Sequence, residues 1–288
     1  MIATMTATAP RSRSLRRFAL AILLAAGAAP AAAHDFCLLP EAPRAEPGTP
    51  VVIAMHVSDV FPGDVVPWRT GRIVEFFATD SRGRWDVVDP AIEGDPAKAR
   101  IALRSKGTAV IALSTDAAYI ELKPEEFEAY LKHEGHEAIL EARRKSGRSE
   151  TPGRERYSRH VKTVVNAGGP QASVALTRAG LPLEIVPETD LARLRPGSRL
   201  DVRVFSGSDP YVEAQICATW AGREGGHDTY AWCGRTDGAG RAQVPIEAPG
   251  WQMIRTTRMI PLRDDPKADW QSFWAAFTFE VEPEETKP

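Results

Sequence analysis

The sequence is poor in the residues and motifs that mark most enzymes. It has six histidines and three cysteines in 288 residues. It contains no Gly-x-Ser-x-Gly, no His-Glu-x-x-His, no phosphate-binding glycine loop and no cysteine-histidine nucleophile setting. We therefore predict a protein that is not an enzyme. Glycoside hydrolysis by two carboxylates stays open, because acidic residues are abundant and their spacing in sequence does not fix their spacing in the fold.

Long apolar runs are also missing. The longest, Phe18–Ala29, is shorter than the roughly 20 residues that a membrane-spanning helix needs. Four arginines between residues 11 and 17 precede it, and Ala31–Ala33 follows it with the small residues that signal peptidases recognise. We predict that residues 1–33 are a signal peptide and that the mature chain works in the periplasm without spanning the membrane.

No excess of positive charge is present either. The formal net charge is −2, and no cluster of basic residues forms a stripe along the chain after the leader. Nucleic acid is therefore not expected as a partner. The 22 glycines and 23 prolines are spread throughout, which favours short strands and turns over a bundle of helices.

Alternating apolar and polar residues predict a mainly β protein made of two antiparallel β-sandwiches. Segments such as Val51–Val57 and Thr108–Leu113 predict an N-terminal sandwich over residues 34–120. Segments such as Leu183–Pro187 and Arg199–Phe205 predict a C-terminal sandwich over 181–283, of immunoglobulin-like or transthyretin-like type. Between them, Pro124 and an i, i+3, i+4 apolar pattern predict a helical insertion or connector over 121–170.

Three cysteines in an exported protein suggest one disulfide and one remaining thiol. A hairpin folded about Gly225 would place Cys217 opposite Cys233, at a distance that a disulfide can span. We predict that these two cysteines are joined. No Cys-x-x-Cys motif is present, so a structural role is favoured over a redox role.

Cleavage after Ala33 would make His34 the first residue of the mature chain. Its α-amine and its imidazole could then chelate one metal ion, and a nitrogen site of this kind suits Cu(II), Ni(II) or Co(II). The alternative is an inert N-terminus. A closed site needs further ligands, which could come from Cys37, His56, His160 or the pair His133 and His136. The pair is more readily explained as surface residues, and His227 as part of an exposed hairpin tip.

The densest group of polar residues lies between positions 154 and 162. It consists of Arg154, Glu155, Tyr157, Arg159 and Lys162. Arginine offers a bidentate fork and tyrosine a hydroxyl donor, so the group could clamp an anion or a carboxylate. Ion pairing that holds the helices against a sandwich is the alternative, and it is slightly favoured because buried polar groups need partners.

Several stretches together resemble the bacterial exported family called domain of unknown function 4198. The resemblance covers nearly all of the mature chain, and it is carried by Ala33–Phe36, Phe61–Gly63, Glu126-Phe127 with Tyr130-Leu131, Arg154-Glu155 with Tyr157–Arg159 and Lys162, Leu183–Glu188, Thr236-Asp237 with Gly240, and Trp270–Ala275 with Thr278–Glu280. The C-terminal part also resembles carboxypeptidase regulatory-like domains, which are small β-sandwiches without catalytic residues.

The resemblance implies an association with nickel or cobalt uptake, with a membrane metal-uptake permease as partner. Two positions depart from the family pattern. Cys37 stands where the family usually has tryptophan, and Arg258 stands before Met259 where the family commonly has histidine. Arginine does not ligate metals, so a site that used that histidine would lack a ligand here.

From these observations we expect a periplasmic component that binds nickel, cobalt or copper through His34, with Cys37 or His56 as further ligands. Two alternatives stay open. One is a cell-envelope module that binds a peptide or glycan without metal. The other is a copper-dependent oxidase built on the N-terminal histidine.

Overall fold

The computed structural model describes residues 34–284 except 47–48, 59, 69, 88–89, 95, 169–172 and 226–228. These residues belong to one unit, Ala31–Pro288. The predicted signal peptide, the Ala33–His34 cleavage point and His227 therefore lie outside or at the edge of the described residues. No helix in the described part is long and apolar enough to cross a membrane.

The strands form three sheets. The first has the order β1-β2-β7-β6, with β3 beside β2. Its strands are β1 Asp35–Pro40, β2 Val51–Ser58, β3 Asp64–Val66, β6 Ala91–Glu93 and β7 Lys98–Ile101. A nine-stranded sheet has the order β15-β14-β17-β18-β10-β8-β4-β5, with β9 beside β10.

The strands of the nine-stranded sheet come from both ends of the chain: β4 Ile73–Asp80, β5 Gly83–Asp86, β8 Thr108–Thr115, β9 Ala118–Leu122, β10 Gly153–Asn166, β14 Gln215–Trp220, β15 Trp232–Arg235, β17 Gly250–Pro261 and β18 Trp270–Val281. The four-stranded sheet contains β11 Leu183–Pro187, β12 Arg199–Ser206, β13 Asp209–Pro210 and β16 Arg241–Pro245.

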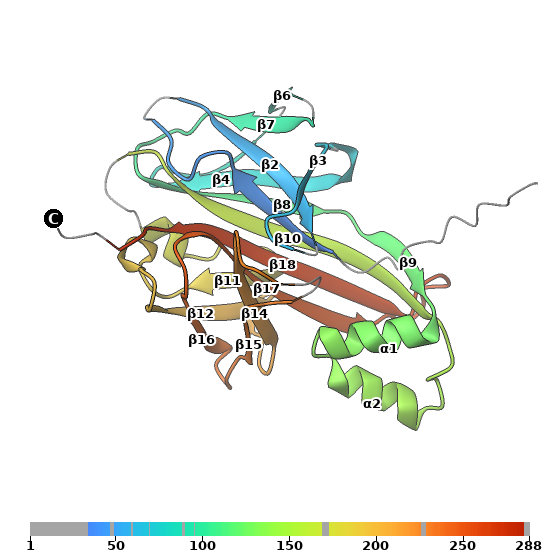
Figure 1. The fold of residues 1–288 in the computed structure, drawn as a ribbon. Helices are drawn as coiled ribbons and strands as arrows, with labels where there is room; N and C mark the ends of the chain where they lie inside the picture. The colour runs from blue at the N-terminus through green and yellow to red at the C-terminus, as the bar shows by residue number, and fades with distance from the viewer. Residues whose placement is uncertain are drawn as a thin grey trace, which may run out of the picture. The chain divides into compact units, whose positions relative to one another are not determined.

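The nine-stranded sheet is the middle layer of the protein (Figure 1). Because side chains alternate along a strand, each of its long strands contributes to two cores. On β10, Val161 packs into the core beneath the five-stranded sheet. Val164, on the opposite face of the same strand, packs against the core beneath the four-stranded sheet. Met253 and Ile254 divide in the same way. The two sandwiches thus share one sheet.

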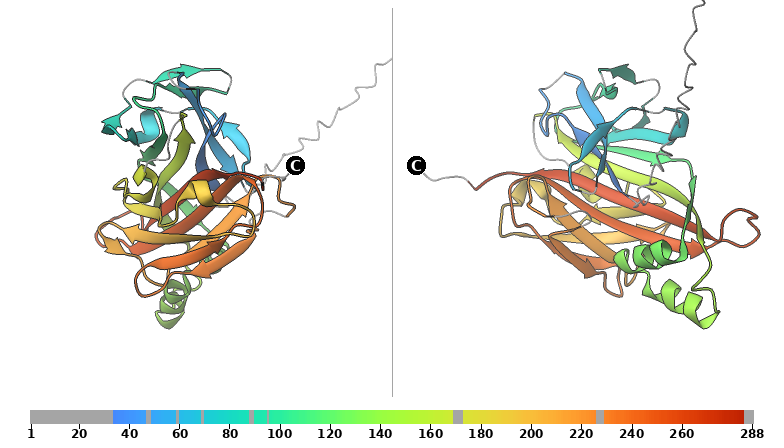
Figure 2. Two further views of the ribbon diagram at one scale, coloured as in Figure 1. Left: turned by 90° about the vertical axis from the view of Figure 1, so that its left-hand side faces the viewer. Right: turned by 45° about the vertical axis from the view of Figure 1, so that its right-hand side comes forward.

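A parallel pair joins the two halves. Strand β10 pairs with β18 in parallel, with Glu155 opposite Trp270 and Thr163 opposite Thr278, whereas the other ladders of this sheet are antiparallel. Strands β10, β17 and β18 are long, and Figure 2 shows them running side by side across the protein. The register therefore sets which residues of β10 meet which residues of the C-terminal strands.

Two short helices cover one end of the middle sheet (Figure 1). They are α1 Pro124–His133 and α2 Glu137–Lys145, and single turns of 3-10 helix occur at Thr70–Arg72, Ser173–Leu176 and Leu191–Arg193. Proline and acidic residues in the first turn of α1 suit a helix start. Phe127 and Leu131 are buried in a small core with Met259 of β17.

The prediction of a mainly β protein with antiparallel sandwiches and a helical insertion is confirmed. The helical part is shorter than expected, because 153–166, which fell within the predicted helical connector, is strand β10. Its alternation of polar and apolar residues serves two buried faces, so it lacks the simple pattern of a half-exposed strand. How the chain divides into domains stays a prediction.

Candidate functional site

Strand β10 separates the polar group predicted over 154–162 onto two faces. Glu155, Tyr157 and Arg159 share one face with Val161, on the side of the five-stranded sheet. Lys162 lies on the other face, where it binds Glu184. The five residues therefore do not form one clamp.

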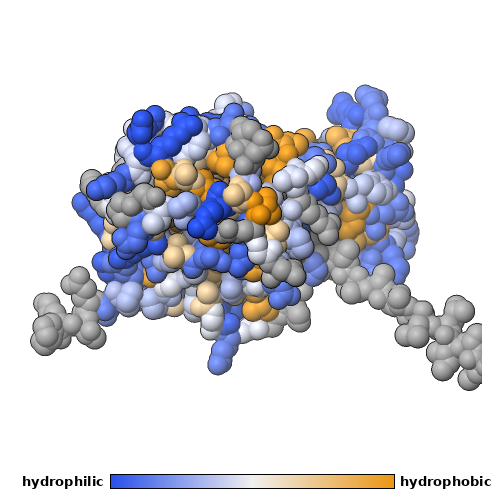
Figure 3. Space-filling view, turned by 90° about the horizontal axis from the view of Figure 1, so that it is seen from above, coloured by the Kyte–Doolittle hydropathy of each residue, from blue (hydrophilic) through white to orange (hydrophobic). Residues whose placement is uncertain are grey.

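A cavity of about 310 Å³ opens between the two layers of the N-terminal sandwich. Strands from both layers line it: β1 contributes Phe36, β2 contributes Met55 and Val57, and β10 contributes Tyr157 and Arg159. The remaining lining residues are Val66, Pro67, Arg72, Ile73 and Thr115. The five-stranded sheet forms its roof, and Figure 3 shows that this side of the protein carries small apolar patches among hydrophilic residues.

Arg159 occupies the inner wall of this cavity. Its Nη1 donates to the backbone oxygen of His34 at 2.8 Å. Its guanidinium carbon lies 5.4 Å from the ring centres of Phe36 and Tyr157 and 5.7 Å from that of Trp274. Burial lowers the pKa of Arg159, and Tyr157 and Asp35 oppose that shift. Aromatic faces thus stabilise this cation, with no carboxylate bound to it among the described residues.

A buried charge network begins beside His34. Arg255 of β17 places Nε 2.8 Å from Asp35 Oδ1, and its Nη1 donates to Glu134 Oε2 at 2.7 Å. Asp35 accepts a hydrogen bond of 2.9 Å from the Tyr230 hydroxyl. Thr257 donates to Glu134 at 3.0 Å. One buried arginine therefore links the start of β1 to the end of α1.

These contacts shift the ionisation of the network's acids and of its arginine. Burial opposes the charge of Glu134, yet Arg255 and His133 hold the pKa of its carboxyl at about 2. For Asp35, burial raises the pKa and Arg255 offsets only part of the rise. Burial also works against the charge of Arg255, but the two acids raise its pKa well above its ordinary value. The network is thus a buried ion pair in which Arg255 and Glu134 stay charged.

Glu155 lies on the same side of β10, in a second polar cluster. Its Oε1 accepts hydrogen bonds from the Ser272 hydroxyl and, at 3.2 Å, from Tyr130. Ser272 in turn accepts from Trp274 Nε1 at 3.0 Å, and the Tyr130 ring stacks on the Trp274 ring. Burial raises the pKa of Glu155 to about 7, although these hydrogen bonds oppose the shift. The same tryptophan therefore contacts both Glu155's partner and Arg159.

The structure does not gather His34, Cys37 and His56 into a metal site. His34 and Cys37 are three residues apart on an extended strand, which separates them by roughly 10 Å and points them to opposite sides. Cys37 lies opposite His56 in the β1–β2 register, is buried, and burial raises the pKa of its thiol. His56 Nδ1 lies 3.4 Å from the Gly63 carbonyl. Among the described residues, no three His, Cys, Asp or Glu side chains are grouped as metal ligands.

The other three histidines among the described residues have structural contacts. His133 ends α1, with Nδ1 3.0 Å from Glu134, and His136 precedes α2, with Nε2 3.0 Å from the Thr257 hydroxyl. They therefore lie on different helices, contrary to a shared helix face. His160 bonds Ser114 and Ser158 on the other side of β10, and burial lowers its pKa to about 4.

Arg258 bears on the metal expectation taken from the family pattern. It packs over the Tyr211 ring at 5.4 Å and bonds the Ser206 hydroxyl, on the side of the four-stranded sheet. Arg255 and Thr257 alternate with it on β17 and face the His34 side. A histidine at position 258 would therefore lie across the sheet from His34 and could not share a metal ion with it.

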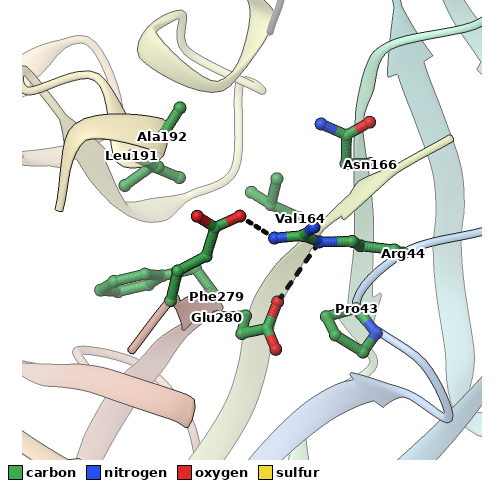
Figure 4. A pocket seen from close by; sticks show the side chains of 9 residues that line it. Pro43, Arg44, Val164, Asn166, Leu191, Ala192, Phe279 and Glu280 are labelled. Carbon is green, nitrogen blue, oxygen red and sulfur yellow. Dashed lines mark ion pairs between the residues drawn. The ribbon is translucent and has the colours of Figure 1, made fainter. Parts of the chain in front are cut away.

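The other predicted residues hold the fold together. Arg154 forms a bidentate pair with Asp269 at 2.9 Å. Cys217 and Cys233 are joined in a disulfide across β14 and β15, where the register places them opposite each other. A second, smaller hollow of about 50 Å³ lies near the ends of β10 and β18. Arg44 reaches across it to the carboxylates of Glu280 and Glu282 (Figure 4), so its own ion pairs close it.

Sequence reasoning missed Arg255 and Glu134, which form the buried charge network with Asp35. A signal for Arg255 was present, because it is the one charged residue in the apolar and threonine-rich run Met253–Thr257. A charge at a buried strand position needs a partner. The partner could not be read from sequence, since Glu134 lies 121 residues earlier.

No curated protein matches this chain. Among solved structures, the D0-D1 domain of intimin has 12% identity and a TM-score of 0.20, and the match covers 86% of this chain and 98% of that one. The Yersinia pseudotuberculosis adhesin InvE has 14% identity and a TM-score of 0.19, covering 84% and 58%. Escherichia coli alpha-2-macroglobulin has 12% identity and a TM-score of 0.22, covering 87% and 18%. These scores are too low to indicate a shared fold.

A family model does match most of the chain. It spans residues 31–259 and so includes the strands β1, β2 and β10 that line the cavity, together with most of β17. The resemblance drawn from the sequence motifs is thereby confirmed. The chain belongs to the family described as domain of unknown function (DUF4198).

Proposed function

We propose that this protein is a periplasmic binding protein, not an enzyme, that holds a small ligand in the cavity of its N-terminal sandwich. The observation that carries the proposal is the cavity itself, about 310 Å³ of space between two sheets that are otherwise tightly packed. Small-molecule sites typically have volumes of about 300–1,000 Å³ and apolar walls with a few polar groups. The cavity fits that description.

The residues that line the cavity favour a binding site over a void left by imperfect packing. Phe36 and Met55 belong to the apolar core, whereas Tyr157 and Arg159 bring polar groups to the same space. A void left by imperfect packing is usually lined by apolar atoms alone. Polar groups that converge on an apolar cavity are characteristic of a binding site.

The experiment uses a neutral, apolar, environment-sensitive dye with the full mature protein. The dye should gain fluorescence on binding, and Val66→Trp, which fills the cavity from β3, should abolish the gain. Val212→Trp is the control, because Val212 is an exposed apolar residue outside the lining. Equal dye binding by wild type and Val66→Trp would contradict the proposal.

Metal binding at His34 is a second candidate, favoured by one observation. Arg159 holds the His34 carbonyl at 2.8 Å, so cleavage after Ala33 would leave an α-amine and an imidazole at a fixed place. They would supply two nitrogen ligands for nickel, cobalt or copper, and delivery to a membrane uptake permease would follow. The described residues supply no closed ligand set beside them.

The test of this candidate compares protein that begins at His34 with protein that carries one extra N-terminal alanine. The first should bind Ni(II) or Cu(II) more tightly in calorimetry, because only it has the free chelating amine. Mass spectrometry of exported protein should give His34 as the first residue. Equal metal affinities, or a different first residue, would end the metal candidate and leave the cavity proposal untouched.

A further inference from the structure

The chemistry of the cavity's ligand can be inferred from the donors of Arg159. A guanidinium has five N–H donors. Within the described residues, one of them is used, by the His34 carbonyl at 2.8 Å. The aromatic rings of Phe36, Tyr157 and Trp274 stabilise its charge but accept no conventional hydrogen bond from it. The arginine therefore has unused donors at the cavity wall.

The other polar groups of the cavity already have partners. Arg72 is paired with Asp116, and its Nη2 also donates to the Asp116 carbonyl at 3.4 Å. The Thr115 hydroxyl donates to the Asp116 carbonyl at 3.0 Å and accepts from the backbone N–H of Arg159 at 3.1 Å. Arg159 is thus the cation left to act on a ligand, with Tyr157 as a further polar residue of the lining.

The cavity has no acidic residue among its described lining. Asp35 acts on Arg159 from a distance, but no carboxylate among the described residues forms an ion pair with it. A partly desolvated positive charge without a bound anion is unfavourable, and an anion that binds it relieves that cost. Arginine favours carboxylates in particular, because its planar fork matches their two oxygens. The absence of an acid in the lining also leaves nothing to bind an ammonium group, which disfavours free amino acids.

The rest of the lining is apolar. Met55, Val57 and Val66 face the cavity from the five-stranded sheet, and Phe36 and Ile73 complete the wall. Such a surface suits a hydrocarbon body and gives nothing to a hydrated inorganic anion or a sugar. One available cation beside an apolar wall matches a ligand with a single negative charge at one end.

We propose that the cavity binds a small aliphatic monocarboxylic acid, with its carboxylate on Arg159 and Tyr157 and its hydrocarbon chain against Phe36, Met55 and Val57. This inference rests on the proposed function, since it names the ligand class of the same cavity. It also gives Arg159 a directly bound carboxylate, which the described residues do not supply.

The test measures binding of octanoate, octanamide and octanol to the full mature protein by calorimetry. The three probes share a hydrocarbon chain and differ in the head group, so their ratio isolates the carboxylate. Octanoate should bind about 10- to 100-fold more tightly than octanamide, as expected for a charge-assisted hydrogen bond. Arg159→Gln should remove that preference while octanamide binding changes little.

Two matched variants sharpen the result. Arg159→Lys keeps the charge without the bidentate fork, so it should retain part of the octanoate preference. Arg193→Gln removes an exposed arginine, whose side chain is 84% accessible, and should leave all three affinities unchanged. Circular dichroism checks that the Arg159 variants fold.

The outcomes separate this inference from the proposed function. Equal affinity for octanoate and octanamide, both abolished by Val66→Trp, would overturn the carboxylate assignment and keep the cavity as a binding site. A preference for octanoate that survives Arg159→Gln would also overturn it. If no probe binds and the apolar dye does not bind either, the proposed function falls together with the inference.

Discussion

Two cations three residues apart on β10, the buried Lys162 and the half-buried Arg159, differ in one respect. Lys162 is 2% exposed and donates to Glu184 at 2.7 Å, and Glu184 also accepts backbone N–H groups of Ala179 and Gly180. Arg159, on the opposite face, has a carbonyl and aromatic rings but no carboxylate. The same strand therefore carries one cation that forms an ion pair within the fold and one that forms no ion pair among the described residues.

The difference separates the two sandwiches. Beneath the four-stranded sheet, the polar groups are satisfied and the core is closed around Lys162 and Glu184. Beneath the five-stranded sheet, Ile53 and Ile111 are fully buried, whereas side chains beside Arg159 leave the cavity unfilled. Positions that depart from ordinary packing and pairing are where function is expected. Stability and binding thus depend on opposite faces of one strand.

The largest effect is expected from breaking the balanced pair. Lys162→Met removes the closest counter-charge of the buried Glu184 and leaves Arg178, 4.0 Å away, as its remaining cation, so it should lower the free energy of unfolding by about 3–5 kcal/mol in urea denaturation. The double variant Lys162→Met/Glu184→Gln should recover much of this loss, because it removes the buried carboxylate charge. A loss below about 1 kcal/mol for the single variant would contradict the role given to the pair.

A pH-dependent effect of up to about 3 kcal/mol is expected from Glu155. Its pKa is raised from 4.5 to about 7 in the folded protein, so the folded state holds this proton more tightly than the unfolded chain. Its contribution is greatest below pH 4.5 and is lost as pH rises to about 7. The free energy of unfolding of Glu155→Gln, measured relative to that of wild type, should therefore be higher at pH 8 than at pH 5.

The pH dependence of stability must be compared between wild type and Glu155→Gln, because other groups also titrate in this pH range. His160, with a pKa lowered to about 4, favours the folded state as pH rises towards 6.5, which opposes Glu155. Glu134, with a pKa of about 2, contributes stability above pH 4.5 that is lost as pH falls below it. Both groups are present in wild type and in Glu155→Gln, so their effects cancel. A difference that stays constant from pH 5 to pH 8 would rule out the ionisation of Glu155 in this range.

The smallest effect on stability is expected at Arg159. Arg159→Leu loses one hydrogen bond to His34 and several ring contacts, but it also removes a poorly solvated charge. We expect the free energy of unfolding to change by no more than about 1 kcal/mol. Urea denaturation beside Lys162→Met gives the comparison directly. A loss as large as that of Lys162→Met would make Arg159 a structural residue.

Much of the fold was predictable because its strands follow local patterns. The predicted strand segments 183–187 and 199–205 match β11 and β12 almost residue for residue, and the predicted helical insertion contains α1 and α2. Strand β10 was harder to predict, since both of its faces are buried and it carries charges on each. The alternation of polar and apolar residues expected for a strand with one solvent-exposed face does not apply to such a strand.

The site was predictable only in its parts. The sequence places Tyr157 and Arg159 in a group that could clamp an anion or a carboxylate, and both line the cavity. Glu155 and Lys162 stood beside them in sequence and proved to serve different clusters. The partners that separate them come from β18 and β11, and no local pattern in the sequence specifies which distant strands pair.

The parallel pairing of β10 with β18 has a consequence for how the chain is made. Strand β18 joins the C-terminal strands to β10, and it consists of residues 270–281, near the end of a chain of 288. Synthesis proceeds from the N-terminus, so neither core is complete until β18 has been made. A chain that stopped at residue 259, where the family match ends, would leave the sides of β10 and β17 that face β18 unpaired and prone to associate with other chains.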